Sequence, residues 1–477
     1  MNKLFNIILA CMLGLCMTAC SEDEMPTTGD EPQQDPTLAP KVVSTLPAAD
    51  ATDADVLDGI TVTYNKNIYV PPVVTIDING TYIEEVSVSG NKLYIPFPMD
   101  EGETYTVTIS KPSVRDSLYN FAADYTFTFS TKTTNTFDPS LFDIDEALTT
   151  ASPMKQTASV YDFLRENFGK KVIAAAVSSG ALDTDMADKI QEMTGKYPVI
   201  NSFDFLHHIN SAPLNPSNWI DYTDMTVPET WWADGGLVSF MWHWNVPCTE
   251  ADKDNFQNYA FYCNGAGEKN TDFNAANAVV SGTYENTIVN RDLDVIADYL
   301  LSLQQKRIPV IWRPLHEAAG NVPSGGKAWF WWGNAGADAY KALWRYMYDY
   351  FKAKGINNLI WVWTSVTDDA DWYPGDEYVD IIGYDYYESD ENKFHQSLPS
   401  VMAKLQGIIS NRKILALSEC GAMPSVENMM KNGDVWSWVM PWNGDYTTNP
   451  YYNPESLFRE MYESGNVITR DEMPDLK

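Results

Sequence analysis

The sequence has few histidines and none of the motifs that hold catalytic metals or phosphates. Only five of its 477 residues are histidine. None of them stands in a spacing such as His-Glu-x-x-His, which zinc hydrolases use. A glycine loop of the Walker type is missing as well. These absences disfavour a metal hydrolase and phosphate chemistry, and we expect neither a metal ion nor another cofactor.

Basic residues are also scarce. The chain has 32 Lys and Arg against 65 Asp and Glu, which gives a formal net charge of −33. Such a chain would repel nucleic-acid backbones and anionic lipid surfaces, so nucleic acid is not expected as a partner. A neutral polymer fits this charge, although acidity by itself also serves solubility.

Cysteine is rare in the part of the chain that is expected to fold. Three of the six cysteines lie within the first 20 residues. Cys248 and Cys263 flank a loop rich in Asn and Gly, and an oxidising compartment would permit a disulfide between them. The sequence leaves that pairing open. Cys420 has no base beside it in the sequence, which favours a small buried side chain.

The apolar run at the N-terminus, residues 4–19, is shorter than the roughly 20 residues that a membrane-spanning helix needs. Residues 1–19 are therefore predicted to be a signal peptide. The small residues before Cys20 resemble a bacterial lipobox, in which the cysteine becomes lipidated; an ordinary secretory signal is the alternative. The acidic residues 21–24 resemble lipoprotein export signals. We expect a lipid anchor at Cys20 and a location at the surface of the cell outer membrane.

Two folded units should follow. Residues 20–40 contain little that is apolar and are predicted to form an acidic flexible tether. Residues 41–133 show period-two patterning between turn signals, which indicates a small all-β sandwich that resembles bacterial immunoglobulin-like modules and serves as a spacer. Its predicted strands are 59–64, 73–78, 92–95, 104–109 and 125–129.

From residue 138 to residue 477, short apolar runs alternate with helical patterns. This alternation predicts an α/β fold with parallel strands and crossover helices, and eight such units fit a (β/α)8 TIM barrel. The predicted strands are 171–175, 199–205, 237–242, 309–312, 359–363, 379–384, 413–417 and 435–439. Helical periodicity is clearest over 290–306, 338–354 and 398–410.

Two glutamates mark the candidate active site. Glu317 comes just after the fourth predicted strand, and Glu419 ends the seventh. In a TIM barrel catalytic groups lie where strands end, and a carboxyl group facing the core would be costly. A retaining glycosidase needs two carboxyl groups about 5 Å apart, one protonated and one ionised. The pair therefore predicts glycoside hydrolysis, although strand ends also carry acidic residues for solvation.

Residues near this pair could differentiate the two carboxyl groups. Tyr387, just after the sixth strand, could donate its hydroxyl to Glu419. His316 could hydrogen-bond sugar or a carboxylate, or simply be packed. Tryptophans are dense at the strand ends, where indoles can stack on sugar rings. Some of them must serve packing alone.

Five segments resemble glycoside hydrolase family 26, whose typical activity is endo-β-1,4-mannanase. Residues 312–317 (Trp-Arg-Pro-Leu-His-Glu), followed by 329–333 (Trp-Phe-Trp-Trp-Gly), are similar to the acid/base segment of that family. Residues 242–245 (Trp-His-Trp-Asn) resemble its third-strand motif. The pair Asp385 and Tyr387, the pair Ser418 and Glu419, and residues 441–443 (Pro-Trp-Asn) match in the same way.

The resemblance implies a role for each of these positions. Glu317 would be the general acid/base and Glu419 the nucleophile. Substrate-binding roles are implied for His243, His316, Trp331, Trp332, Asp385, Tyr387 and Trp442.

The chain departs from the family pattern in two places. Residues 318–327 form a longer connection after Glu317, and no arginine stands beside Trp442. The resemblance predicts a monomeric retaining endo-β-1,4-mannanase whose partner is a β-mannan-type polysaccharide: mannan, glucomannan or galactomannan. Two alternatives stay open, a hydrolase of mixed-linkage β-glucan or β-1,3-xylan, and a surface glycan-binding protein without turnover.

Overall fold

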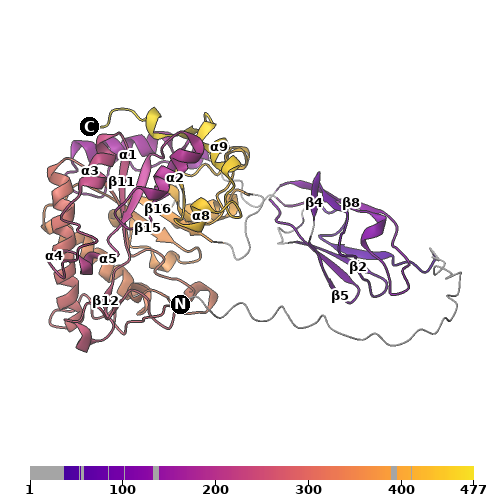
Figure 1. Cartoon of the computed structure of the whole chain (residues 1–477), viewed down its shortest axis with the longest axis horizontal. Coiled ribbons are helices and arrows are strands. Elements are labelled where there is room, and N and C mark those ends of the chain that lie inside the picture. Colours follow the sequence, from indigo (N-terminus) through magenta and orange to yellow (C-terminus); the bar gives the residue numbers. More distant parts are fainter. Residues whose placement is uncertain are drawn as a thin grey trace, which may run out of the picture. The chain divides into compact units, whose positions relative to one another are not determined.

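The computed structural model describes residues 37–52, 54, 59–83, 85–100, 102–132, 139–387, 395–409 and 411–477. The predicted signal peptide, Cys20 and the tether up to residue 36 lie outside these residues. The chain divides into two compact units: one runs to Lys132 without residues 100–102, and the other holds residues 100–102 and Thr133–Lys477. Figure 1 shows both. Within the described residues, no helix combines the length and apolar character needed to cross a bilayer.

The described residues of the first unit form two antiparallel four-stranded sheets, which confirms the predicted immunoglobulin-like sandwich. One sheet has the order β1-β2-β6-β5 and the other β4-β3-β7-β8. Alternate side chains of β7 are buried, as period-two patterning requires. The strands are β1 (Val42–Leu46), β2 (Gly59–Tyr64), β3 (Ile76–Ile78), β4 (Thr81–Ile83), β5 (Ser87–Ser89), β6 (Lys92–Pro96), β7 (Thr104–Ile109) and β8 (Tyr125–Ser130).

Eight parallel strands form a closed barrel in the second unit, so the predicted TIM barrel is confirmed. Each strand pairs with the next, and β9 pairs with both β10 and β18 to close the ring. A short strand, β19 (Val467–Ile468), pairs in parallel with the start of β9. The barrel strands are β9 (Val172–Val177), β10 (Ile200–Asp204), β11 (Leu237–Trp242), β14 (Val310–Pro314), β15 (Leu359–Ser365), β16 (Ile381–Tyr386), β17 (Ile414–Cys420) and β18 (Trp438–Pro441).

Helices lie around the outside of the strands (Figure 1). The longest, α4, begins at Tyr284 and not at 290, because Thr283 caps it by accepting a hydrogen bond from the Asn286 backbone. Its apolar face packs on the barrel. The helices are α1 (Lys155–Asn167), α2 (Asp185–Thr194), α3 (Thr226–Ala233), α4 (Tyr284–Gln305), α5 (Ala337–Ala353), α6 (Pro399–Ile409), α7 (Val426–Asn432), α8 (Asp445–Thr448) and α9 (Glu455–Glu463).

A two-stranded ribbon, β12 (Val246–Pro247) with β13 (Tyr259–Ala260), follows the third barrel strand. Its register places Cys248 against Asn258, because the Cys248 N–H donates to the Asn258 carbonyl at 3.0 Å. Cys263 instead bonds through its N–H to the Trp329 carbonyl. Both thiols are free and buried. The disulfide that the sequence left open is therefore not formed.

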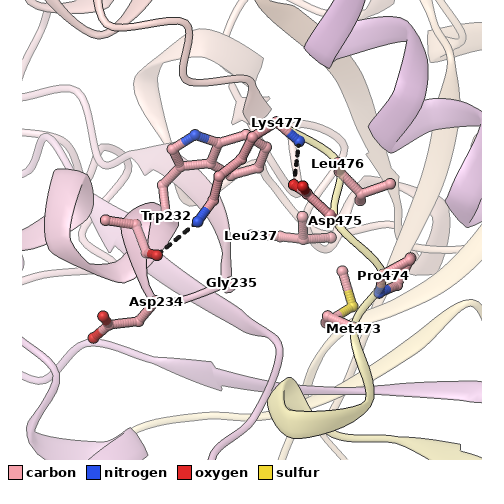
Figure 2. A pocket seen from close by; sticks show the side chains of 10 residues that line it. Trp232, Asp234, Gly235, Leu237, Met473, Pro474, Asp475, Leu476 and Lys477 are labelled. Atoms are coloured by element: carbon pink, nitrogen blue, oxygen red, sulfur yellow. Dashed lines mark hydrogen bonds between the residues drawn. The ribbon is translucent and has the colours of Figure 1, made fainter.

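A cavity of about 350 Å³ lies where β11 begins, at the end of the strand remote from the predicted catalytic residues. The C-terminal segment from Met473 to Lys477 forms one wall, and α3 with the turn after it forms the other (Figure 2). The Lys477 ammonium group donates to the Ala233 carbonyl at 2.6 Å. In TIM barrels this face is associated with stability and the opposite face with catalysis.

Candidate active site

Glu317 stands on a strained turn directly after β14. Leu315 and Glu317 both have left-handed backbones, with φ of 49° and 50°. Such conformations cost about 1–3 kcal/mol each at non-glycine residues and persist only where neighbours enforce them. Here the indole N–H of Trp332 donates to the His316 carbonyl at 2.8 Å, and the Tyr340 hydroxyl donates to the Leu315 carbonyl at 3.1 Å. These contacts hold the backbone of the turn that carries Glu317.

The environment of Glu317 favours its protonated form. Its carboxyl accepts a hydrogen bond from the Trp329 indole at 3.2 Å. Burial, and then the negative charges of Asp385 and Glu419, raise the pKa of Glu317 well above its ordinary value. Within the described part of the chain, Glu317 forms no ion pair. A carboxyl group in this state can donate a proton at neutral pH.

Glu419 has the opposite environment. It lies near the end of β17, its side chain is 6% exposed, and one carboxylate oxygen pairs with the Arg313 guanidinium. The other oxygen accepts a hydrogen bond from the Tyr387 hydroxyl at 3.0 Å. The carboxyl group of Glu419 thus accepts hydrogen bonds from two donors, one of which is cationic. Glu419 is therefore paired with a cation on one side and oriented by a hydroxyl on the other.

Arg313 joins Glu419 to a third carboxyl group, that of Asp385. Its other terminal nitrogen contacts Asp385 at 3.0 Å, and the Ser418 hydroxyl donates to Asp385 at 2.7 Å. Burial, opposed by Arg313 and reinforced by Glu419, raises the pKa of Asp385 to about 7. Two carboxyl groups thus contact one guanidinium. Arg313 contacts Asp385 and Glu419 directly but forms no ion pair with Glu317 among the described residues, so the burial of Glu317 is not offset by a directly paired cation.

A second chain of contacts connects Asp204 to two histidines. Asp204, at the end of β10, contacts the His243 ring nitrogen Nδ1 at 2.5 Å, and the Nε2 atoms of His243 and His316 are 3.2 Å apart. Although burial opposes it, the charge of Asp204 and its hydrogen bond raise the pKa of His243. Burial, and then the charge of His243, lower the pKa of His316 well below its ordinary value. His316 is therefore neutral and His243 is the protonatable member of the pair.

The predicted site residues gather at one end of the barrel, with differing access to solvent. Tyr387 is 41% exposed, and Trp442 is partly exposed with its ring centroid 6.1 Å from that of His243. His243 is also partly exposed. His316 and Asp385 are buried and bonded to other site residues. These two orient the site more than they offer a surface to sugar.

The sugar contact expected of Trp331 and Trp332 is corrected by the structure. Both residues are 0% exposed. The Trp331 indole N–H donates to the Trp244 carbonyl at 2.8 Å, and that of Trp332 supports the turn at His316. Their polar atoms are satisfied by backbone, and their rings pack inside the barrel unit. They are positioning residues beneath the site.

The sequence-based assignment omitted Arg313, Asp204 and Trp329 as site residues. Arg313 offered a signal, since a cation inside an apolar strand is costly unless carboxylates pair with it. Asp204 ends an apolar strand in the same way that Glu419 does. The described residues contain no group of three or more His, Cys, Asp or Glu side chains arranged to hold a metal ion.

A TIM barrel whose strand ends present one carboxyl group with a raised pKa and another that is paired with an arginine has the architecture of barrel glycosidases. The chain belongs to glycosyl hydrolase family 26, whose model matches residues 149–472. A bacterial Ig-like domain model matches residues 36–131.

Curated relatives and solved structures agree with this membership. A mannan endo-1,4-beta-mannosidase of Thermothelomyces thermophilus is 34% identical over 69% of this chain and 64% of that protein. Mannan endo-1,4-beta-mannosidase B of a Piromyces species is 31% identical over 66% and 51%. The chain thus spans about half to nearly two thirds of the length of these relatives.

Among solved structures, the GH26 domain of an endo-beta-mannanase/endo-beta-glucanase from Prevotella bryantii is 38% identical, with a TM-score of 0.61 over 69% of this chain and 100% of that one. A beta-mannanase from a symbiotic protist of the termite Reticulitermes speratus is 35% identical, with a TM-score of 0.59 over 70% and 99%. That structure contains a gluco-manno-oligosaccharide.

Proposed function

We propose that the chain is a retaining endo-β-1,4-mannanase that cleaves mannan, glucomannan or galactomannan through a covalent glycosyl-enzyme. One observation carries the mechanism: Glu419 is paired with Arg313 and Tyr387, whereas the pKa of Glu317 is raised. The two carboxyl groups are thereby separated into a nucleophile and an acid. The mannan specificity is supported by the relatives named above, which carry that activity.

In the first step, the Glu419 carboxylate attacks the anomeric carbon, and the bond from that carbon to the glycosidic oxygen breaks. Glu317 gives its proton to the departing oxygen, so the aglycone leaves as an alcohol and Glu317 becomes a carboxylate. The Tyr387 hydroxyl and the Arg313 guanidinium hold Glu419 in place for the attack.

The second step uses the same groups, but Glu317 now acts as a base instead of an acid. Once Glu419 is an ester, it carries no negative charge, so one of the charges that raised the pKa of Glu317 is gone. Glu317 can then stay ionised and take a proton from water. That water attacks the anomeric carbon and frees Glu419, which leaves the sugar with its original configuration.

Two variants separate the roles. Glu419→Ala removes the nucleophile and should abolish turnover of every substrate while the fold is retained; turnover like that of the unaltered enzyme would contradict the assignment. Glu317→Ala should slow cleavage of polysaccharide by about 10²–10⁴-fold and spare aryl glycosides with good leaving groups. Equal losses on both substrates would contradict an acid role for Glu317.

The substrate is tested by product analysis on linear mannan, galactomannan, mixed-linkage β-glucan and β-1,3-xylan, with Glu419→Ala as the inactive control. Oligosaccharides from the mannans alone support a mannanase. Products from β-glucan or xylan alone would keep the mechanism and replace the substrate. Binding without products would favour the glycan-binding alternative.

We further propose that Cys20 is lipidated and anchors the chain at the outer membrane surface, with the immunoglobulin-like unit as a spacer. The lipobox-like residues before Cys20 and the acidic residues after it support this location. Cells fed an alkyne-labelled fatty acid should label the natural chain but not a Cys20→Ser variant. Labelling of both, or of neither, would contradict the anchor.

A further inference from the structure

Four tyrosines form a continuous row that starts at the nucleophile. Tyr387, which donates to Glu419, packs edge-on against Tyr446 with ring centroids 5.5 Å apart. Tyr446 contacts Tyr452 at 4.6 Å, and Tyr452 contacts Tyr451 at 5.3 Å. The last three belong to the segment between β18 and α9, Tyr446 in the short helix α8 and the other two in the turn after it. The row therefore connects the catalytic carboxylate to a surface formed by the eighth barrel loop.

Buried hydrogen bonds fix this loop against its neighbour. The Asn453 side-chain amide, on a residue 2% exposed, donates to the carbonyls of Gly421 and Tyr446 at 2.7 and 2.8 Å. Its oxygen accepts from the Met423 backbone at 2.8 Å. At Gly421 a Cβ atom would come within 3.1 Å of the Tyr446 ring. The loop after β18 is thus tied to the loop after β17, and its tyrosines are presented in a set arrangement.

The residues at the ends of the row are more exposed to solvent than those in its middle. Tyr446 and Tyr452 are partly exposed, while Tyr451 is 57% exposed. Aromatic rings held at the surface on an ordered loop lose little conformational freedom when a ligand stacks on them. The polysaccharide is the ligand that fits this position, because the row begins at Tyr387, which donates to the carboxylate proposed as the nucleophile.

We propose that Tyr446, Tyr451 and Tyr452 form an extended binding site for sugar residues beyond those at the cleaved bond. The C–H faces of β-linked sugars pack on aromatic rings. A neutral polymer meets no repulsion from the acidic chain. This inference rests on the proposed function, and it assigns the eighth loop a role in selecting long substrates.

The test compares a linear β-1,4-mannose hexasaccharide with the trisaccharide, using the full chain and its Tyr451→Ala and Tyr446→Ala variants. The loss of each ring should raise KM for the hexasaccharide about 3- to 10-fold and should change KM for the trisaccharide less. Tyr82→Ala is a matched control, since Tyr82 is 73% exposed but lies in the immunoglobulin-like unit. The Tyr82→Ala variant should leave KM for both substrates unchanged.

Equal effects on both chain lengths, or no effect from either tyrosine variant, would overturn the inference. Because Tyr446 is packed, Tyr451→Ala remains informative if Tyr446→Ala fails to fold. Binding of the hexasaccharide to Glu419→Ala, with and without Tyr451→Ala, separates this inference from the proposed function. Absence of mannan cleavage by the unaltered chain contradicts the function, whereas unchanged binding on removing Tyr451 contradicts the extended site.

Discussion

Arg313 and Glu419 form an ion pair between the fourth and the seventh barrel strands, with side chains only 2% and 6% exposed. The same guanidinium holds Asp385 on the sixth strand. Three strands of the ring are thus joined by one cation at the end of the barrel where the proposed catalytic glutamates lie. Because the carboxylates would otherwise be buried without a partner, Arg313 supports both the fold and the chemistry.

Replacing Arg313 by Met should therefore destabilise the barrel as well as inactivate it. Removal of one partner from a buried pair costs about 3–5 kcal/mol. The loss should be smaller at mildly acid pH than at neutral pH, because protonation neutralises the unpaired carboxyl groups. Urea unfolding at several pH values measures this, with Arg313→Lys as the charge-retaining control. A loss that did not depend on pH would contradict the electrostatic explanation.

The activity should decline as pH rises through the pKa of Glu317, because the acid must be protonated in the free enzyme. The charge of Asp385 helps to raise that pKa. Asp385→Asn should therefore move the basic limb of the kcat/KM profile to lower pH, together with a loss of activity from the disturbed Arg313. Measurement of kcat/KM against pH for both enzymes checks the direction. An unmoved or alkaline-shifted limb would show that Asp385 does not act on Glu317.

Removing the Tyr387 hydroxyl should affect catalysis more than substrate affinity. A hydrogen bond to a charged group contributes about 1.5–3 kcal/mol, so Tyr387→Phe should lower kcat about 10- to 100-fold. The ring and its packing on Tyr446 are kept, and the ratio of KM values for long and short oligosaccharides should therefore stay the same. Steady-state kinetics on both chain lengths separate these effects. A changed ratio with intact kcat would assign Tyr387 to binding alone.

The barrel and its carboxyl pair could be predicted from the sequence because both follow from local patterns. Apolar runs that alternate with helical patterns predicted the eight strands, and position at a strand end pointed to Glu317 and Glu419. Arg313 was harder to assign, since its partners Asp385 and Glu419 lie far away in the sequence and meet it only when the barrel closes. Pairings of this kind depend on the shape of the ring, which no single segment encodes.

The tryptophans show a second limit of prediction from the sequence. A cluster of indoles after a strand indicates an aromatic loop but not which rings face inward, and Trp331 and Trp332 are turned to the interior. The sequence likewise does not decide whether Cys248 and Cys263 form a disulfide, because their pairing depends on the register of a short ribbon. Orientation and register are set by tertiary packing, which overrides what composition suggests.

The corrected role of Trp332 leads to a prediction that distinguishes positioning from sugar binding. Trp332→Phe keeps most of the buried ring but removes the N–H that donates to the His316 carbonyl, beside the strained backbone of Glu317. The turn should relax, so that the acid is misplaced and kcat falls, while KM changes little. The unpaired carbonyl should also lower the free energy of unfolding by about 1–3 kcal/mol. Steady-state kinetics and urea unfolding of Trp332→Phe measure these changes. Trp442→Phe is the comparison variant, because Trp442 is partly exposed near His243 and its substitution should change KM. A rise in KM with unchanged kcat and stability for Trp332→Phe would restore it as a sugar contact.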